Sequence, residues 1–335
     1  MVCTHHPATR RSVLEVLLPA ERLGVSNTSG LGDDGIDYSE FEKLGETVYF
    51  GEVSREELFR IVKDCDALIV NKIEVDENLL SACPKLKYVG TFATGYNVVD
   101  TAACSRRGIT VCNVPDYSTH PVSQHVFALL LNFLGAIDKY TSSVAAGDWI
   151  KSKAFTYFPY PTYELYGKTF GIYGYGNIGK AVAKIADAFG AKVVICTRTP
   201  PENCPYTLLS ADELFKVSDI ISLHCPLTEA TEKLINERTI SLMKRNAVLI
   251  NTARGGLVDE EALANALNGG RIAGACVDTV SVEPMKADNP LLHAKNCYIT
   301  PHVAWTAKET RNRLIKIAAA NVRAFKEGKP QNTVN

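Results

Sequence analysis

A glycine-rich turn near the middle of the chain constrains the fold more than any other segment. Residues 169–173 have the β-branched and aromatic character of a short strand, and the glycines follow it directly. Residues 180–189 then carry apolar side chains at helical spacing, Gly190 is a helix-ending residue, and residues 192–196 form the next expected strand. The glycines are Gly174, Gly176 and Gly179. This order predicts a complete βαβ unit.

The spacing of these glycines predicts a dinucleotide-binding turn. Gly174 permits the tight turn, Gly176 lets the backbone approach a pyrophosphate, and Gly179 lets the helix pack closely on the strand. The amides of Asn177 and Ile178 at the start of the helix would hold the phosphates. Glycines that merely punctuate a turn would not require a strand and a helix in register on either side, so we expect a nucleotide-binding domain.

The end of the second strand bears on the choice of dinucleotide. A carboxylate there would bind the adenosine ribose hydroxyls and repel a 2′-phosphate, but none is present. The strand instead runs into Thr197, Arg198 and Thr199, which offer hydrogen-bond donors and a positive charge to a phosphate. We therefore expect NADP(H) to be favoured over NAD(H). The alternative is that Arg198 is only a solvated loop residue and that NAD(H) binds.

Length, charge and cysteine usage narrow the class of protein. A length of 335 residues suggests two domains. A formal net charge of -1 gives no electrostatic basis for binding nucleic acid or an anionic membrane. The longest apolar run, residues 126–137, is too short to span a bilayer. Ten scattered cysteines, with neither a CxxC pair nor a zinc-like grouping, fit free thiols. We expect a cytoplasmic protein with no nucleic-acid, membrane or metal partner.

The part of the chain before the glycine-rich turn is expected to form a second α/β domain. Strands and helices alternate from Tyr38 to Cys112, which predicts a parallel sheet, and this block contains no phosphate-binding fingerprint. Residues 13–18 and 23–26 could each provide the first strand. A long amphipathic helix at residues 308–326 follows the last strand of the nucleotide domain, so we expect it to pack on this other domain.

An aromatic segment lies between the two blocks. Residues 121–134 form a long apolar helix, and a proline-containing loop follows. The aromatic residues of this region are Trp149, Phe155, Tyr157, Phe158, Tyr160, Tyr163 and Tyr166. Their density exceeds the needs of one domain core and predicts a subunit interface, hence a homodimer. A lid or ordinary surface packing are the alternatives.

Three polar side chains with catalytic chemistry, Arg254, Glu283 and His302, each follow one of the last three expected strands. The carboxyl ends of parallel strands meet at one edge of the sheet, where the reactive end of the cofactor lies. Histidine exchanges protons near neutral pH, a neighbouring carboxylate fixes its tautomer, and a guanidinium grips a carboxylate through two hydrogen bonds. Singly, each could be a surface residue; together they predict a catalytic set. The amides of Thr94 and Gly95, after an earlier strand, could hold a substrate carboxylate or form a plain turn.

Five segments in order resemble one known family. They are the glycine-rich turn, His224–Thr228, Asn251–Gly255, Asp278–Pro284 and Pro301–Trp305. From about Tyr38 to Asn335 the chain resembles the D-isomer-specific 2-hydroxyacid dehydrogenases, and within them the hydroxypyruvate or glyoxylate reductase (glycerate dehydrogenase) group.

The resemblance implies a fold and a domain plan. The fold is α/β, with two doubly wound parallel-sheet domains: a flavodoxin-like substrate domain and an inserted Rossmann nucleotide-binding domain. The substrate domain would be discontinuous, comprising residues 1–112 and 303–335. The Rossmann domain would span residues 113–302, with a dimerisation arm near 121–166.

The resemblance also implies roles for individual residues. Arg254 would bind the substrate carboxylate and carbonyl, with the amides of Thr94 and Gly95 assisting. His302 would act as general acid or base, paired with Glu283. The cofactor would contact Gly174, Tyr175, Gly176, Asn177, Ile178, Gly179, Thr197, Arg198, Thr199, His224, Pro226, Thr231, Thr252, Ala253 and Asp278, the last of which would orient the nicotinamide carboxamide.

The implied function is reduction of a small 2-oxo acid, hydroxypyruvate or glyoxylate, to the D-2-hydroxy acid with NAD(P)H. A D-lactate-type or aromatic 2-hydroxyacid dehydrogenase uses the same chemistry, and no sequence feature separates these substrates. A different class of function is a dinucleotide-sensing protein similar to the C-terminal-binding corepressors. Turnover with 2-oxo acids would distinguish an enzyme from such a sensor.

Overall fold

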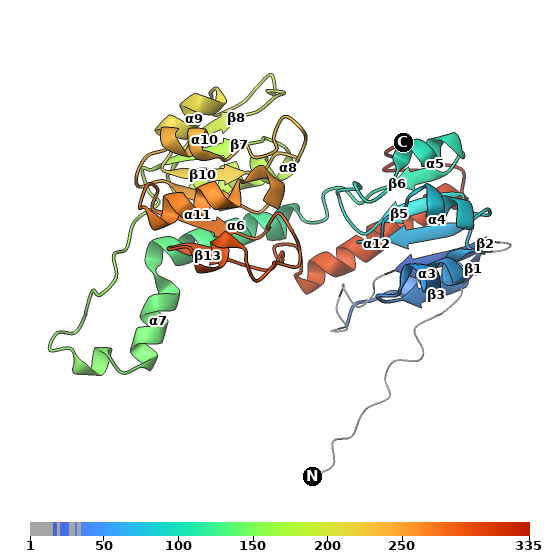
Figure 1. Ribbon diagram of the computed structural model, residues 1–335, viewed down its shortest axis with the longest axis horizontal. Coiled ribbons are helices and arrows are strands. Elements are labelled where there is room, and N and C mark those ends of the chain that lie inside the picture. The colour runs from blue at the N-terminus through green and yellow to red at the C-terminus, as the bar shows by residue number, and fades with distance from the viewer. Residues whose placement is uncertain (1–15, 19–20, 27–30, 32–34) are drawn as a thin grey trace, which may run out of the picture. The chain divides into compact units, whose positions relative to one another are not determined.

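The chain divides into two compact units (Figure 1). The computed structural model describes residues 16–18, 21–26, 31 and 35–335, so residues 13–15 of one expected first strand lie outside the described residues. The first unit contains the described residues up to Ser118 and Thr306–Asn335, and the second unit contains Thr119–Trp305.

The boundaries of the units lie at 118/119 and 305/306, whereas the sequence placed domain boundaries at 112/113 and 302/303. Local hydrogen bonds account for both differences. The amide of Val114 donates to the Ala93 carbonyl (2.9 Å), which ties the segment after residue 112 to the first unit. The amides of Val303 and Ala304 each donate to the Asp278 carboxylate (2.9 Å), which ties the segment after residue 302 to the second unit.

The first unit is built on a six-stranded sheet. Five of its strands are parallel and lie in the order β3-β2-β4-β5-β6, which in chain order is the flavodoxin-like 2-1-3-4-5 arrangement. β1 pairs antiparallel with β2, so both segments expected to provide a first strand form strands. The bounds are β1 Val16–Leu18, β2 Glu21–Ser26, β3 Thr47–Phe50, β4 Ala67–Val70, β5 Tyr88–Thr91 and β6 Thr110–Cys112.

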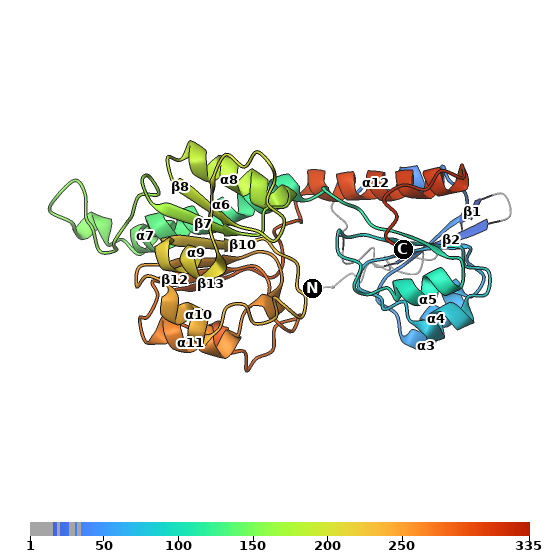
Figure 2. The same cartoon turned by 90° about the horizontal axis from the view of Figure 1, so that it is seen from above.

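Helices cover both faces of this sheet, with α12 on one face and α3, α4 and α5 on the other (Figure 2). Acidic or hydroxyl N-caps begin the three short helices: Ser54, Asp76 and Asp100 each accept a backbone N–H from the first turn. The long helix α12 packs on β5, where Phe325 contacts the fully buried Tyr88 ring. The bounds are α2 Ser39–Glu42, α3 Arg55–Val62, α4 Glu77–Ala82, α5 Thr101–Arg106 and α12 Lys308–Lys326.

The second unit is a seven-stranded parallel sheet in the order β9-β8-β7-β10-β11-β12-β13. In chain order its first six strands are 3-2-1-4-5-6, the Rossmann arrangement, and the strand order reverses between β7 and β10. The bounds are β7 Thr169–Tyr173, β8 Lys192–Cys196, β9 Thr207–Leu208, β10 Ile220–Leu223, β11 Val248–Asn251, β12 Gly274–Val277 and β13 Cys297–Ile299. The two predicted doubly wound parallel-sheet folds are therefore confirmed.

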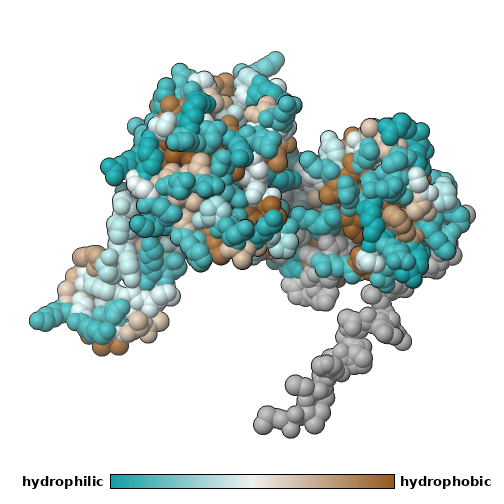
Figure 3. Space-filling view, in the orientation of Figure 1, coloured by the Kyte–Doolittle hydropathy of each residue, from teal (hydrophilic) through white to brown (hydrophobic). Residues whose placement is uncertain are grey.

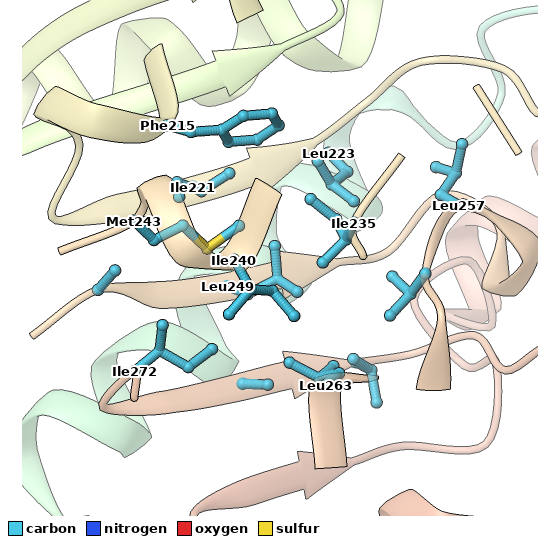
Figure 4. Close-up of a cluster of buried hydrophobic side chains, with 14 of the residues drawn as sticks. Phe215, Ile221, Leu223, Ile235, Ile240, Met243, Leu249, Leu257, Leu263 and Ile272 are labelled. Carbon is cyan, nitrogen blue, oxygen red and sulfur yellow. The ribbon is translucent and has the colours of Figure 1, made fainter. Parts of the chain in front are cut away.

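Two apolar cores cover the faces of this sheet. Successive residues of β11 alternate between them: Leu249 packs under α9, α10 and α11 (Figure 4), whereas Val248 and Ile250 pack under α6 and α8. This alternation explains why the central strands read as continuous apolar runs. The bounds are α6 Thr119–Gly135, α8 Asn177–Ala188, α9 Ala211–Val217, α10 Glu237–Leu242 and α11 Glu260–Asn268, with short 3-10 turns η2 Gly255–Leu257 and η3 Pro290–His293.

An arm leaves the second unit after α6, where Ala136 adopts a positive φ of 49° and α7 (Ile137–Ala145) begins (Figure 1). The Tyr140 hydroxyl donates to the Tyr160 carbonyl (2.7 Å) and its ring meets Tyr157 edge to face, which closes the arm on itself. Apolar side chains lie among polar ones near its tip (Figure 3), and Phe155 is 88% exposed. Among the described residues, no helix has the length and apolar character to cross a membrane.

Candidate active site

The glycine-rich turn lies between β7 and α8, beside the point where the strand order reverses. Gly174 has a φ of 99°, and a Cβ there would lie 2.6 Å from the Cys225 nitrogen. A Cβ on Gly179 would lie 2.2 Å from the Gly174 carbonyl oxygen, so the helix approaches the turn too closely for any side chain. A Cβ on Gly176 would meet no atom of the described part of the chain within 4 Å. Two glycines therefore shape the turn, and the third leaves open space beside it.

The start of α8 is suited to a phosphate. Gly176 is its N-cap, and no side chain among the described residues caps the helix. The first amides of a helix carry partial positive charge, and an uncapped start next to open space presents them to an anion. Asn177 and Ile178, which the sequence assigned to phosphate binding, are the first two residues of this helix. The turn therefore fits the pyrophosphate of a dinucleotide.

Buried polar atoms without partners mark the same edge of the sheet. Within the described part of the chain, His224 Nδ1, Thr252 Oγ1 and Thr279 Oγ1 are buried and make no hydrogen bond. They follow β10, β11 and β12, respectively. Leaving such a group unpaired costs about 1–3 kcal/mol, so this edge fits a ligand that offers polar partners. The sequence prediction included His224 and Thr252 but missed Thr279, whose only signal was its place beside Asp278.

Burial also fixes the charge of His224. Desolvation lowers the pKa of His224 to about 3, so the ring is neutral at physiological pH. Its Nε2 lies 2.8 Å from the Ser222 hydroxyl, while Nδ1 remains available. His224 can therefore exchange a hydrogen bond with a ligand without adding charge to the site.

A hollow of about 590 Å³ lies beside Arg198, which the sequence assigned to the adenosine end of the cofactor. Arg198, Thr228, Glu229 and Ala230 line it. Glu229 therefore lines the same hollow as Arg198, although sequence reasoning missed it because it lies on the loop after a different strand. Thr231, expected to contact the cofactor, donates to the Pro226 carbonyl (2.7 Å) and so holds the shape of this loop.

His302 and Glu283 form a direct pair. The Nδ1 atom of His302 lies 2.8 Å from Glu283 Oε2, and both side chains are about one-third exposed (31% and 29%). His302 has a φ of 55°, in the left-handed region that non-glycine residues seldom adopt. The sequence predicted both residues, and the structure brings them together.

The loops that carry Arg254 and Glu283 are packed against each other. A Cβ on Gly255 would lie 1.9 Å from the Val280 carbonyl carbon, so only glycine permits this approach. Glu260 on α11 holds the second loop, because its carboxylate accepts from the Ser281 amide (2.6 Å) and hydroxyl (2.7 Å). Arg254 itself is exposed, and its Nη1 donates to the Ala253 carbonyl (2.7 Å).

The carboxylate of Asp278 forms hydrogen bonds with other groups of the protein. Its fully buried carboxylate accepts from the Thr300 hydroxyl (2.6 Å) and from the amides of Val303 and Ala304 (2.9 Å each). Burial raises the pKa of this carboxyl, but the nearby His125 ring and the hydrogen bonds from Thr300 and the two amides outweigh burial and hold the pKa below its usual range. Asp278 is therefore an anion that orders the chain on either side of His302.

The remaining predicted substrate residues lie in the first unit. Thr94 follows β5, its hydroxyl donates to the Val114 carbonyl (3.0 Å), and its carbonyl accepts from the Asn113 side chain (2.7 Å). These bonds hold the turn that includes Gly95. Their part in substrate binding stays a prediction.

Comparisons with known proteins agree with this geometry. The family profile described as "D-isomer specific 2-hydroxyacid dehydrogenase, NAD binding domain" matches residues 127–304. A hydroxypyruvate reductase of Blautia hydrogenotrophica is 42% identical over 313 residues, which are 91% of this chain and 97% of that protein. A glycerate dehydrogenase of Methylorubrum extorquens is 44% identical over 281 residues, 83% of this chain and 88% of that one.

A solved structure extends the comparison to three dimensions. It is the crystal structure of an NADPH-dependent glyoxylate/hydroxypyruvate reductase from Sinorhizobium meliloti in complex with NADP and malonate. It has a TM-score of 0.79 and 31% sequence identity, covering 93% of this chain and 96% of that one.

Proposed function

The chain belongs to the D-isomer-specific 2-hydroxyacid dehydrogenases, enzymes that use a nicotinamide dinucleotide, and we propose that it reduces hydroxypyruvate or glyoxylate. The product would be the 2-hydroxy acid, of D configuration where C2 is a stereocentre. The contact between His302 and Glu283 carries this proposal, because it joins a proton donor and its orienting carboxylate at the carboxyl edge of the sheet. The names of the similar reductases and dehydrogenases support the choice of substrate.

In the proposed reaction, His302 is the general acid. The dinucleotide, when bound, supplies a hydride to C2 of the 2-oxo acid. With Nδ1 held by Glu283, the Nε2 atom of His302 is the one left to donate a proton to the carbonyl oxygen. In the reverse direction the same nitrogen accepts the proton from the 2-hydroxyl.

Arg254 would bind the substrate carboxylate. A guanidinium has five N–H donors, and the bond to the Ala253 carbonyl uses one of its nitrogens. The remaining donors can form a paired contact with a carboxylate, which fixes the substrate with its carbonyl toward His302. The same positive charge stabilises the negative charge that develops on the carbonyl oxygen.

NADP(H) is the proposed preferred cofactor. Arg198 lines the adenosine hollow, where its guanidinium would pair with a 2′-phosphate. The NADP complex of the similar Sinorhizobium meliloti reductase supports this expectation. Glu229 in the same hollow works in the opposite direction, because a carboxylate favours the free ribose hydroxyls of NAD(H). The attraction between the Arg198 guanidinium and a 2′-phosphate would outweigh the effect of Glu229.

The arm is proposed to join two copies of the chain in a homodimer. Ile150, Phe155 and Phe158 are each more than 80% exposed (88%, 88% and 83%). Large apolar side chains gathered on a projecting segment are typical of an interface that a second chain covers.

The function is tested by following nicotinamide absorbance with purified protein, NADPH or NADH, and hydroxypyruvate, glyoxylate and pyruvate in parallel. Rapid cofactor oxidation with hydroxypyruvate or glyoxylate is expected. A clear preference for pyruvate would move the assignment to a D-lactate-type enzyme. Tight cofactor binding with no oxidation of any substrate would contradict the proposed reductase and favour a dinucleotide sensor.

A further inference from the structure

A histidine outside the proposed catalytic set faces the same edge of the sheet. His125 lies on α6, its side chain is 20% exposed, and its Nε2 lies 2.9 Å from the Thr300 hydroxyl. The same nitrogen is 3.4 Å from Asp278 Oδ1. α6 packs over β12 at this point, so the imidazole is held by its helix rather than by a loop.

The direction of these hydrogen bonds follows from their chemistry. An ionised carboxylate only accepts, so Thr300 must donate its single hydroxyl hydrogen to Asp278 Oδ1 at 2.6 Å. The Thr300 oxygen can then only accept from His125, whose Nε2 must carry a hydrogen. The result is a one-way relay from His125 to Thr300 to Asp278, which fixes the tautomer of the histidine.

Asp278 in turn fixes three consecutive amides. Its backbone carbonyl accepts from His302 N (2.8 Å), Oδ1 accepts from Val303 N (2.9 Å), and Oδ2 accepts from Ala304 N (2.9 Å). These bonds hold the left-handed turn at His302, a conformation that costs about 1–2 kcal/mol and persists only where surrounding contacts determine it. The position of the imidazole of His302 therefore depends on where the Asp278 carboxylate is held.

We propose that His125 and Thr300 are positioning residues for the reaction, acting on His302 through Asp278. This inference rests on the proposed role of His302 as the proton donor. His125 does not need to touch substrate or cofactor, because its Nε2–H orients the Thr300 hydroxyl and the hydroxyl orients the carboxylate. The relay sets the alignment of His302 with the substrate carbonyl, and it governs turnover rather than cofactor binding.

The test compares variants that keep or remove the donor. His125→Phe removes the Nε2–H at similar size, whereas His125→Gln keeps an amide N–H within reach of the same oxygen. Thr300→Val removes the hydroxyl at nearly constant shape, and Thr300→Ser retains it. We expect kcat for hydroxypyruvate to fall about tenfold in His125→Phe and in Thr300→Val, since small misalignments of a catalytic group cost about this much or more. His125→Gln and Thr300→Ser should stay within about twofold of the unmodified enzyme.

A double substitution separates a relay from two independent effects. Because His125 acts through Thr300, the His125→Phe/Thr300→Val protein should be no slower than Thr300→Val alone, while independent sites would multiply to about a hundredfold. The dissociation constant for NADPH should be unchanged in all of them, and Gln124→Phe, an exposed neighbour on α6, should have normal kcat. Should His125→Phe fail to fold, Thr300→Val against Thr300→Ser makes the same comparison.

Different results would contradict the His125–Thr300 relay and the proposed function. His302→Asn is included as the reference, since asparagine tolerates a positive φ. Normal turnover in His302→Asn would overturn the proposed function. Loss of turnover in His302→Asn with normal kcat in His125→Phe, or multiplied losses in the double variant, would overturn the relay and leave the proposed function standing.

Discussion

Replacing Asp278 by asparagine is expected to destabilise the second unit substantially. The carboxylate is fully buried and accepts three hydrogen bonds, two at Oδ1 and one at Oδ2. The amide group of asparagine has one oxygen and one NH₂. Its least costly orientation keeps the oxygen toward Thr300 and Val303 and turns the NH₂ toward the Ala304 amide, where two donors then face each other.

The magnitude follows from the bonds that change. One charge-assisted hydrogen bond is lost, worth about 1.5–3 kcal/mol, and the buried Ala304 N–H is left unpaired, at a further cost of about 1–3 kcal/mol. The two bonds that remain become neutral and weaker. We therefore expect the free energy of unfolding to fall by roughly 3–5 kcal/mol. For a unit of this size that lowers Tm by roughly 6–20 °C.

The pH dependence provides the sharper check. The pKa of Asp278 is lowered in the folded protein, so its contribution to stability is present above the unfolded pKa and is lost as the pH falls through the folded pKa. The stability gap between Asp278→Asn and the unmodified protein should therefore be constant from about pH 8 to pH 5 and narrow only in stronger acid. Thermal unfolding followed by calorimetry across this range measures it. A difference in the free energy of unfolding below about 1 kcal/mol at neutral pH would show that the hydrogen bonds of Asp278 do not stabilise the unit as described.

Three further sets of substitutions test other parts of the proposed function. Arg198→Ala should raise KM for NADPH about tenfold and leave KM for NADH unchanged, whereas Glu229→Ala should raise KM for NADH. Equal effects of either substitution on both cofactors would contradict the assignment of this hollow to the adenosine end. Arg254→Gln should lower kcat/KM for hydroxypyruvate about a hundredfold, because the paired contact with the carboxylate is lost; an unchanged value measured by steady-state kinetics would exclude the contact. Phe155→Ser should shift the protein toward monomer in sedimentation velocity, whereas Leu208→Ser, exposed outside the arm, should not; a monomer before any substitution would refute the interface.

The Rossmann unit was predictable because its determinants are local. Gly174 and Gly179 are required because backbone atoms of the turn itself or of the adjoining strand end lie too close for a side chain. The apolar runs of the central strands reflect burial on both faces of the sheet. The placement of His302 and Glu283 at one edge also followed, since parallel strands present their carboxyl ends together. The rule brings both residues to one edge of the sheet, and the structure shows that they are in direct contact there.

The contacts of Asp278 could not be predicted in the same way. Spacing places Asp278 at the correct edge but does not say whether its carboxylate turns to a ligand or to the amides of Val303 and Ala304. His125 had a weak signal, because it lies three residues after Val122 and four before Leu129, on the buried face of its helix. A polar residue on such a face needs a partner, but only packing of α6 over β12 identifies it.

The most direct test of the proposed function is the rate of NADPH and NADH oxidation by hydroxypyruvate in the unmodified protein and in His302→Asn, with cofactor binding measured by fluorescence in both. Rapid oxidation is expected for the unmodified protein. His302→Asn should lose at least about a hundredfold in kcat while binding the cofactor normally. Turnover in His302→Asn close to that of the unmodified protein would contradict the claim that His302, paired with Glu283, is the proton donor.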